Sequence, residues 1–312
     1  MDLVDRVLAG ERLALARLLT QVENDTPLGR TALDRLFEHG GKAHLVGITG
    51  APGTGKSSLT NRLVQRFRAD GYKVAVIAVD PSSPFTGGAL LGDRLRMKDA
   101  AMDRGVFIRS MASRGVLGGL ARATAGMAEV LDAAGFELIL IETVGAGQSE
   151  VDIARLAHTV VVVEAPGLGD DIQAIKAGIL EIADILVVNK ADLPGVENTQ
   201  RALNAMLEIA YHDGTSTSWR PPLLKAIAST GEGVAELADS ILAHARFLRE
   251  TGGWQARSRE RVTIGFLDLL RSTLWERWKA DIGEERLEQT LKRISRREIT
   301  PGAALEDFLR AR

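Results

Sequence analysis

The sequence predicts an α/β fold: a mostly parallel sheet flanked by helices, with helical extensions at both ends of the chain. Short apolar runs rich in Val, Ile or Leu alternate with segments long enough for crossover helices, such as residues 57–70 and 122–134. Such runs are typical of strands that are buried on both faces. Ligands of these sheets bind at the carboxyl ends of the strands. The predicted strands are residues 45–49, 74–80, 106–110, 138–143, 160–165, 185–189 and 223–228.

Helical patterns without strands occupy both ends of the chain. Residues 2–22 carry leucines and valines near helical spacing, and a second amphipathic stretch at 28–39 ends at Gly40-Gly41. Near the other end, Thr300-Pro301 predicts an N-cap followed by the first turn of a last short helix. We therefore expect three parts: an N-terminal helical cap over residues 1–42, a strand-containing domain over 43–250 and a C-terminal helical region over 251–312.

The C-terminal region contains three of the four tryptophans, Trp254, Trp275 and Trp278. A helical appendage without strands of its own has little core in which to bury these rings. Two interpretations stay open. The rings pack onto the body of the protein, or they form a subunit interface.

The composition excludes several classes of protein. The chain has 312 residues, of which 45% are apolar and 26% charged, as in ordinary globular proteins. It has no cysteine, and its five histidines form no metal-binding pair or tract. The net charge of −2 does not indicate binding to nucleic acid, which usually requires a basic surface. No run reaches the ~18 apolar residues of a membrane span, and the start lacks a signal-peptide pattern, so we expect a cytoplasmic protein that binds neither nucleic acid nor membrane.

A phosphate-binding motif follows the first predicted strand. Residues 50–57 fit G-x-x-x-x-G-K-[ST] and lead directly into a predicted helix, which is the context this motif requires. Backbone N–H groups of such a loop enclose the phosphates of a nucleotide. We expect Lys56 to reach the β- and γ-phosphates and the Ser57 hydroxyl to bind Mg²⁺. The predicted phosphate-binding residues are Gly50, Ala51, Pro52, Gly53, Thr54, Gly55, Lys56, Ser57 and Ser58.

A second motif, Asn189-Lys190-Ala191-Asp192, ends the strand predicted at 185–189 and indicates the base. Guanine presents two adjacent donors, N1–H and the N2 amino group, and one carboxylate can accept from both. Adenine would leave the Asp192 carboxylate unpaired, so the pocket should reject it. We expect Lys190 to lie along the base and Asn189 to brace the loop. The ligands predicted are therefore GTP or GDP with Mg²⁺.

The strand predicted at 138–143 carries an acidic residue near its end, Glu142, followed by Gly145 and Gln148. A carboxylate in this place usually polarises a water bound to Mg²⁺, and the Gly145 N–H is placed to sense the γ-phosphate. Most GTPases have Asp where this chain has Glu142. Some small GTPases carry a water-orienting Gln where this chain has Ala146, so we expect slow unassisted hydrolysis unless Gln148 moves in.

Two further acids belong to the same sheet edge. Asp80 ends a predicted strand, and Asp93 lies in the Gly- and Ser-rich segment beyond it. Loops at this edge are where nucleotide-sensitive segments occur. The spacing is compatible with contacts from these acids to Mg²⁺, to the attacking water or to each other's loop.

Together these motifs resemble the MeaB/ArgK family of GTPases, the bacterial chaperones of adenosylcobalamin-dependent acyl-CoA mutases. The resemblance covers almost the whole chain. The stretches that carry the resemblance are residues 50–57, 79–83, 86–94, 142–150 and 166–178. The last two of these stretches are long enough to separate this family from related metallochaperones.

The resemblance implies a site, a partner and an assembly. It implies that Asp80, Asp93 and Glu142 surround Mg²⁺ and the reacting phosphate. It implies that the segment from Asp170 to Lys176 is a mobile loop through which the mutase stimulates hydrolysis. It also implies a homodimer joined through the C-terminal helices, in which GTP binding and hydrolysis gate delivery of adenosylcobalamin and removal of inactivated cofactor.

One departure from the family concerns the loop that cradles the guanine oxygen. The family usually has Ser-Ala there, and this chain has Ile227-Ala228. The Ala228 N–H can still donate to the base, but the support of the serine is missing. We expect weaker guanine affinity, with selectivity maintained by Asp192.

Two other functions are alternatives. One is a kinase linked to lysine, arginine and ornithine transport, which the guanine motif at Asn189–Asp192 disfavours. The other is a nickel-insertion metallochaperone GTPase, which the lack of cysteine and of a histidine cluster disfavours. The favoured function is a GTPase chaperone that delivers adenosylcobalamin to, and protects or reactivates, a mutase of the methylmalonyl-CoA type.

Overall fold

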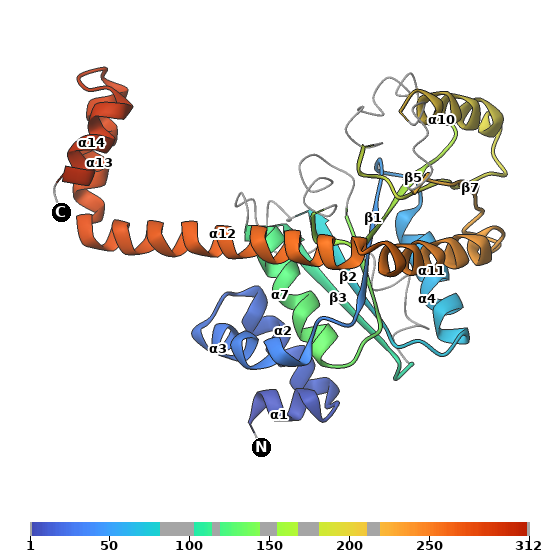
Figure 1. The fold of residues 1–312 in the computed structure, drawn as a ribbon. Helices are drawn as coiled ribbons and strands as arrows, with labels where there is room; N and C mark the ends of the chain where they lie inside the picture. The colour runs from blue at the N-terminus through green and yellow to red at the C-terminus, as the bar shows by residue number, and fades with distance from the viewer. Residues whose placement is uncertain are drawn as a thin grey trace. The chain divides into compact units, whose positions relative to one another are not determined.

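The computed structural model describes residues 2–81, 103–113, 119–143, 155–167, 181–210 and 219–310 (Figure 1). Among these, side chains are described except those of residues 80, 81, 112, 113 and 119–121. The chain forms two compact units, Met1–Arg261 and Val262–Arg312. The domain boundaries drawn from the sequence stay predictions.

The first unit is built on a seven-stranded sheet in which every pair of neighbouring strands is parallel. The strand order is β3-β2-β4-β1-β5-β6-β7, so the first strand lies at the centre. The predicted α/β fold with a mostly parallel sheet is therefore confirmed. The strands are β1 His44–Thr49, β2 Val74–Pro81, β3 Val106–Ser113, β4 Leu138–Glu142, β5 Thr159–Glu164, β6 Ile185–Val188 and β7 Leu223–Lys225.

β7 is three residues shorter than the apolar pattern predicts: it ends at Lys225, although residues 226–228 are also apolar. β3 is three residues longer than predicted and ends at Ser113, and β4 and β6 each end one residue early. After β6 and β7 the backbone turns into loops that bond to each other: the Ala191 N–H donates to the Ala226 oxygen at 3.1 Å. Ile227 then forms an isolated antiparallel bridge with Glu232. The residues after β6 and β7 therefore belong to the ligand-binding edge.

Helices cover both faces of the sheet (Figure 1). One face is covered by α4 (Lys56–Ala69) and α11 (Val234–Thr251), whose Leu59, Leu63 and Leu237 are fully buried against strand side chains. Their apolar residues recur at helical spacing on one side of each helix. The other face is covered by α7 (Gly119–Ala133), and α10 (Val196–Ala210) packs beside β6 and β7.

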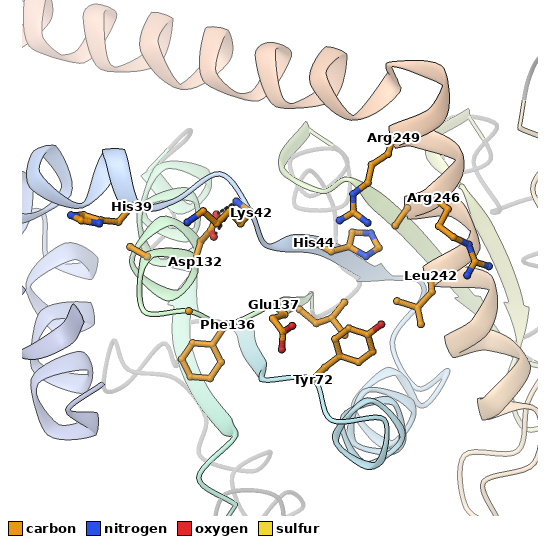
Figure 2. A pocket seen from close by; sticks show the side chains of 14 residues that line it. His39, Lys42, His44, Tyr72, Asp132, Phe136, Glu137, Leu242, Arg246 and Arg249 are labelled. Atoms are coloured by element: carbon orange, nitrogen blue, oxygen red, sulfur yellow. Dashed lines mark hydrogen bonds between the residues drawn. The ribbon is translucent and has the colours of Figure 1, made fainter. Parts of the chain in front are cut away.

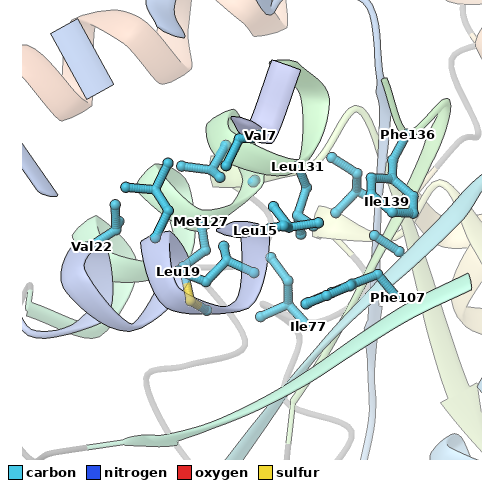
Figure 3. Close-up of a cluster of buried hydrophobic side chains, with 14 of the residues drawn as sticks. Val7, Leu15, Leu19, Val22, Ile77, Phe107, Met127, Leu131, Phe136 and Ile139 are labelled. Carbon is cyan, nitrogen blue, oxygen red and sulfur yellow. The ribbon is translucent and has the colours of Figure 1, made fainter. Parts of the chain in front are cut away.

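The N-terminal helices share the core of the sheet instead of forming one of their own. Leu15 and Leu19 pack in one buried cluster with Ile77 of β2 and Met127 of α7 (Figure 3). The pattern at residues 2–22 is divided into two helices, because Gly10 adopts φ 81° and breaks the helix. The helices are α1 Leu3–Leu8, α2 Arg12–Glu23 and α3 Pro27–Leu36, followed by the short 3₁₀ helix η1 Phe37–His39.

A buried polar network joins the start of α12 (Gly253–Ile282) to the amino ends of β5 and β6. Arg257 donates to both Asp184 oxygens at 2.6 and 2.7 Å. Trp254 stacks on His158 with ring centroids 3.9 Å apart, so this tryptophan packs onto the body of the protein. A buried carboxylate needs such partners, because leaving it unpaired costs about 3–5 kcal/mol.

His44 and His244 belong to this network as well, because Thr159 Oγ1 bonds to both rings and His244 Nε2 lies 3.4 Å from Asp184. These two histidines and His158 are neutral in the folded protein. Burial lowers the pKa of His44 to about 3, of His158 to about 2 and of His244 to about 4. Neighbouring arginines lower these pKa values further, while Asp184 opposes the shift at His244. The unfolded chain binds these protons below a pKa of about 6.5, so it takes up more protons than the folded chain.

We expect the free energy of unfolding to fall as the pH drops below about 6.5, by about 1 kcal/mol per pH unit for each of the three histidines. Urea denaturation at pH 7, 6 and 5 measures this slope. His158→Gln should reduce it, and the matched control His39→Gln, at an exposed position, should not. A slope that is identical in both variants would contradict the assignment.

The second unit consists of the remainder of α12 with α13 (Glu284–Ser295) and α14 (Pro301–Arg310). The predicted N-cap is confirmed: Thr300 Oγ1 accepts from the Ala303 N–H at 3.2 Å. Trp278 packs against Trp275 and Phe308. The described residues include no helix long and apolar enough to span a membrane. Large apolar side chains are nevertheless exposed along α12: Val262, Phe266, Leu269, Leu270, Leu274 and Trp275.

Candidate nucleotide-binding site

The Gly-rich loop lies between the end of β1 and the start of α4, as the motif predicts. Gly50 has φ 138°, and a Cβ there would lie 2.0 Å from the Val163 oxygen. Gly55 has φ 88°, and a Cβ there would lie 2.5 Å from Asn189 Nδ2. Both positions therefore need glycine for conformation and for space. The close approach at Gly55 places the phosphate loop against the residue that begins the predicted base motif.

Lys56 is 6% exposed and its charge is held inside the loop. Its Nζ donates to the Gly50 oxygen at 2.8 Å and to the Ala51 oxygen at 2.9 Å. These carbonyls keep the ammonium among the backbone groups that would surround a phosphate. A bound phosphate oxygen would be a stronger acceptor, because it is charged.

The predicted metal-binding oxygens of Ser57 and Glu142 are in contact. The Ser57 hydroxyl donates to Glu142 Oε1, although the two residues are 85 positions apart. They meet because β1 and β4 are neighbours, with Ile48 opposite Glu142. Glu142 is 5% exposed. A hydroxyl and a carboxylate side by side fit Mg²⁺, which prefers oxygen ligands and keeps several waters.

Several other residues predicted for the phosphate and metal site lack a described side chain or lie outside the described residues. The backbone of Asp80 lies near the end of β2, two residues beyond the Ala78–Glu142 pair of the β2–β4 ladder, but its side chain is not described. Asp93, Gly145, Gln148 and the segment from Asp170 to Lys176 lie outside the described residues. In the described part of the chain, no three His, Asp or Glu side chains gather as a metal cluster.

Asn189 links the phosphate loop to the loop after β7. It is 1% exposed, its Nδ2 donates to the Thr54 oxygen at 2.8 Å, and its Oδ1 accepts from the Ala228 N–H at 3.1 Å. Lys190 adopts φ 55°, which turns the chain sharply at this point. Asp192, two residues on, is exposed and available to a ligand. The expected donor for the guanine oxygen, the Ala228 N–H, is thus bonded to Asn189 in this structure.

Arg62 belongs to none of the motifs, and yet it contacts this site. Arg62 lies on α4 and bonds to the carbonyl oxygens of Ala228 and Ser229, which are more than 160 positions away. A lone arginine on an amphipathic helix is usually solvated, so no pattern would have singled it out.

A cavity of about 510 Å³ lies at the opposite edge of the sheet (Figure 2). It is lined by Lys42, His44, Tyr72, Arg246 and Arg249, among others. His44 begins β1, whereas the phosphate loop follows Thr49 at the other end of the same strand. This cavity is therefore separate from the nucleotide-binding edge.

A glycine-dependent loop between a central strand and a helix, a lysine held within it, and an Asn-Lys-x-Asp segment bonded to that loop define a P-loop GTP-binding protein. Comparison with known proteins agrees. Residues 15–282 match the family described as methylmalonyl Co-A mutase-associated GTPase MeaB. The chain belongs to the MeaB family of GTPases, and the resemblance drawn from its motifs is confirmed.

Individual relatives match most or nearly all of the chain. A Pyrococcus abyssi protein named as a GTPase is 45% identical over 309 residues, covering 99% of this chain and 95% of the relative. GTPase ArgK of Escherichia coli is 38% identical over 259 residues, covering 81% of this chain and 78% of the relative. The crystal structure of an LAO/AO transport system kinase has a TM-score of 0.74 at 28% identity, with 99% of this chain and 95% of that chain covered.

Proposed function

We propose that this GTPase is a chaperone that gates delivery of adenosylcobalamin to a B12-dependent acyl-CoA mutase and protects or reactivates that enzyme. The observation that carries the proposal is the match of residues 15–282 to a family associated with methylmalonyl-CoA mutase. The geometry of the nucleotide-binding site supports the proposal, because Asn189 joins the phosphate loop to the loop proposed to bind the base.

Phosphate binding would centre on Lys56 and the backbone N–H groups of the loop. Lys56 would exchange its contacts with Gly50 and Ala51 for the β- and γ-phosphate oxygens. Ser57 and Glu142, with Asp80 and Asp93, would hold Mg²⁺, which neutralises charge on the phosphates. The Gly145 N–H would sense the γ-phosphate, and Gln148 would orient the attacking water.

Base recognition would depend on Asp192, which accepts from guanine N1–H and N2. Lys190 would cover the base with its stem. The Ala228 N–H, which donates to Asn189 Oδ1 in this structure, would turn to guanine O6. Asn189 would keep its bond to the Thr54 oxygen and so hold the base motif against the phosphate loop.

The partner and the assembly follow from the same proposal. The mutase would act through the segment from Asp170 to Lys176. The C-terminal helices would join two copies, which is supported by the exposed apolar side chains of α12, such as Phe266 at 61% and Trp275 at 49%.

The test is GTP turnover by the full chain with and without an adenosylcobalamin-dependent mutase. We expect the mutase to accelerate turnover by more than about tenfold, since partner proteins accelerate other GTPases by at least this much. Lys56→Ala is the control for contaminating GTPase, and sedimentation of the same preparation should show twice the mass of one chain. A rate that no mutase changes, together with no copurification, would remove the chaperone role and leave the GTPase activity.

A kinase linked to amino-acid transport is a second candidate, because the similar crystal structure described above carries that description. Asn189 and Asp192 disfavour it, since they suit guanine. The same assay separates the two functions: turnover of GTP without turnover of ATP supports the GTPase and excludes an ATP-dependent kinase.

A further inference from the structure

The loop expected to cradle guanine O6 is held in place by a charged side chain from the phosphate-binding helix. Arg62 Nε donates to the Ala228 oxygen at 2.9 Å, and one terminal nitrogen donates to the Ser229 oxygen at 2.5 Å. The other terminal nitrogen donates to Gln65 at 3.3 Å. The guanidinium therefore grips two consecutive carbonyls with its fixed fork of donors.

Ala228 is bonded on both of its sides. Asn189 Oδ1 accepts from the Ala228 N–H and so fixes the peptide plane before this residue. Arg62 donates to the Ala228 oxygen and so fixes the plane after it. The Ala228 N–H lies in the first of these planes, and fixing the second plane limits how far the first can turn. Ile227 offers only an apolar side chain here, and its N–H is used by the Glu232 oxygen at 2.9 Å.

Arg62 also sets where the loop lies relative to the phosphates. It belongs to α4, which begins with Lys56 and Ser57. Asn189 forms a second link, through the Thr54 oxygen. Two independent contacts, one of them charge-assisted, thus hold the base-binding loop against the phosphate-binding loop.

We propose that Arg62 is a positioning residue for guanine: it holds the loop in place while the Ala228 N–H exchanges Asn189 Oδ1, its acceptor in this structure, for O6 of the base. Arg62 would thus supply the support that a serine at position 227 would supply in the family. The inference rests on the proposed base-binding role of this loop. It differs from a purely structural role in one measurable way. The benefit of Arg62 should depend on whether the nucleotide carries an oxygen at position 6.

The test is a comparison of three nucleotides on the full-length protein. GTP has both O6 and N2, ITP keeps O6 but lacks N2, and 6-thio-GTP replaces O6 with the weaker acceptor sulfur. Arg62→Met should weaken GTP and ITP binding by about tenfold each. It should weaken 6-thio-GTP binding by only about twofold, because the sulfur already weakens the hydrogen bond from the Ala228 N–H that Arg62 positions. Arg62→Lys, which can reach one carbonyl, should be intermediate.

The matched control is Arg66→Met, one turn further along α4, where the arginine pairs with Asp70 and Asp239 at the surface. It should leave all three affinities within about twofold of the original, as surface pairs contribute little. If Arg62→Met behaves like this control, or weakens all three nucleotides equally, the positioning role is overturned. If the unsubstituted protein binds GTP, ITP and 6-thio-GTP equally, the proposed contacts to the base are wrong, and the role of Arg62 falls with them.

Discussion

Lys56→Ala is expected to reduce GTP hydrolysis by about 100-fold or more. Removing a fixed charge from a phosphoryl-transfer site costs this much because its stabilisation is greatest as charge develops on the transferring group. The loss should include nucleotide binding, since Nζ is the buried cation of the loop. Single-turnover hydrolysis and binding of a fluorescent GDP analogue measure the two effects separately.

The control is Lys42→Ala, which removes an exposed lysine at the cavity on the opposite edge of the sheet. It should leave hydrolysis unchanged. Unchanged hydrolysis in Lys56→Ala would refute the phosphate role of this residue. Thermal denaturation of both variants shows whether folding contributes, because the bonds from Lys56 to Gly50 and Ala51 are lost as well.

Asp192→Asn is expected to weaken GTP binding by about 100-fold or more and to create binding of XTP. Asparagine presents one acceptor and one donor, so it clashes with the two donors of guanine. Xanthine has N1–H beside a carbonyl at position 2, which matches asparagine. A site that matches hydrogen-bonding groups rejects a mismatched base strongly, because buried polar groups are left unpaired.

Affinities for GTP, XTP and ATP, measured by competition, test this exchange of selectivity. Asp239→Asn removes another exposed carboxylate, on α11, and should change none of them. An Asp192→Asn protein that still prefers GTP would show that this carboxylate does not contact the base.

The fold was largely predictable because buried parallel strands carry a signal in every residue. All the predicted strands are present, and β1 differs from residues 45–49 by one position at its start. The end of β7 was less predictable, since Ile227 and Ala228 are as apolar as the strand before them. Their backbone leaves the ladder because of hydrogen bonds to Glu232 and Asn189, which lie outside any local pattern.

Some residues of the candidate site could likewise be predicted from the sequence, and others could not. Lys56, Ser57 and Asn189 follow strands or open a helix, so chain order alone places them at one edge. Arg62 acts across 166 positions, on a surface that only folding brings together. The sequence around Arg62 contains no motif that indicates this contact, so it is found only in the structure.

The position of β7 at the edge of the sheet, as its last strand, has a consequence for synthesis on the ribosome. The phosphate loop is complete at Ser57, but the segments proposed to bind guanine end at Asp192 and near Ser229. At about 5–20 residues per second, the last of them emerges roughly ten to thirty seconds later. We therefore expect a nascent chain to present a phosphate loop before its base-binding segments are complete. Because a ligand stabilises only a state to which it binds, we expect GTP to stabilise the chain only after β7 has docked.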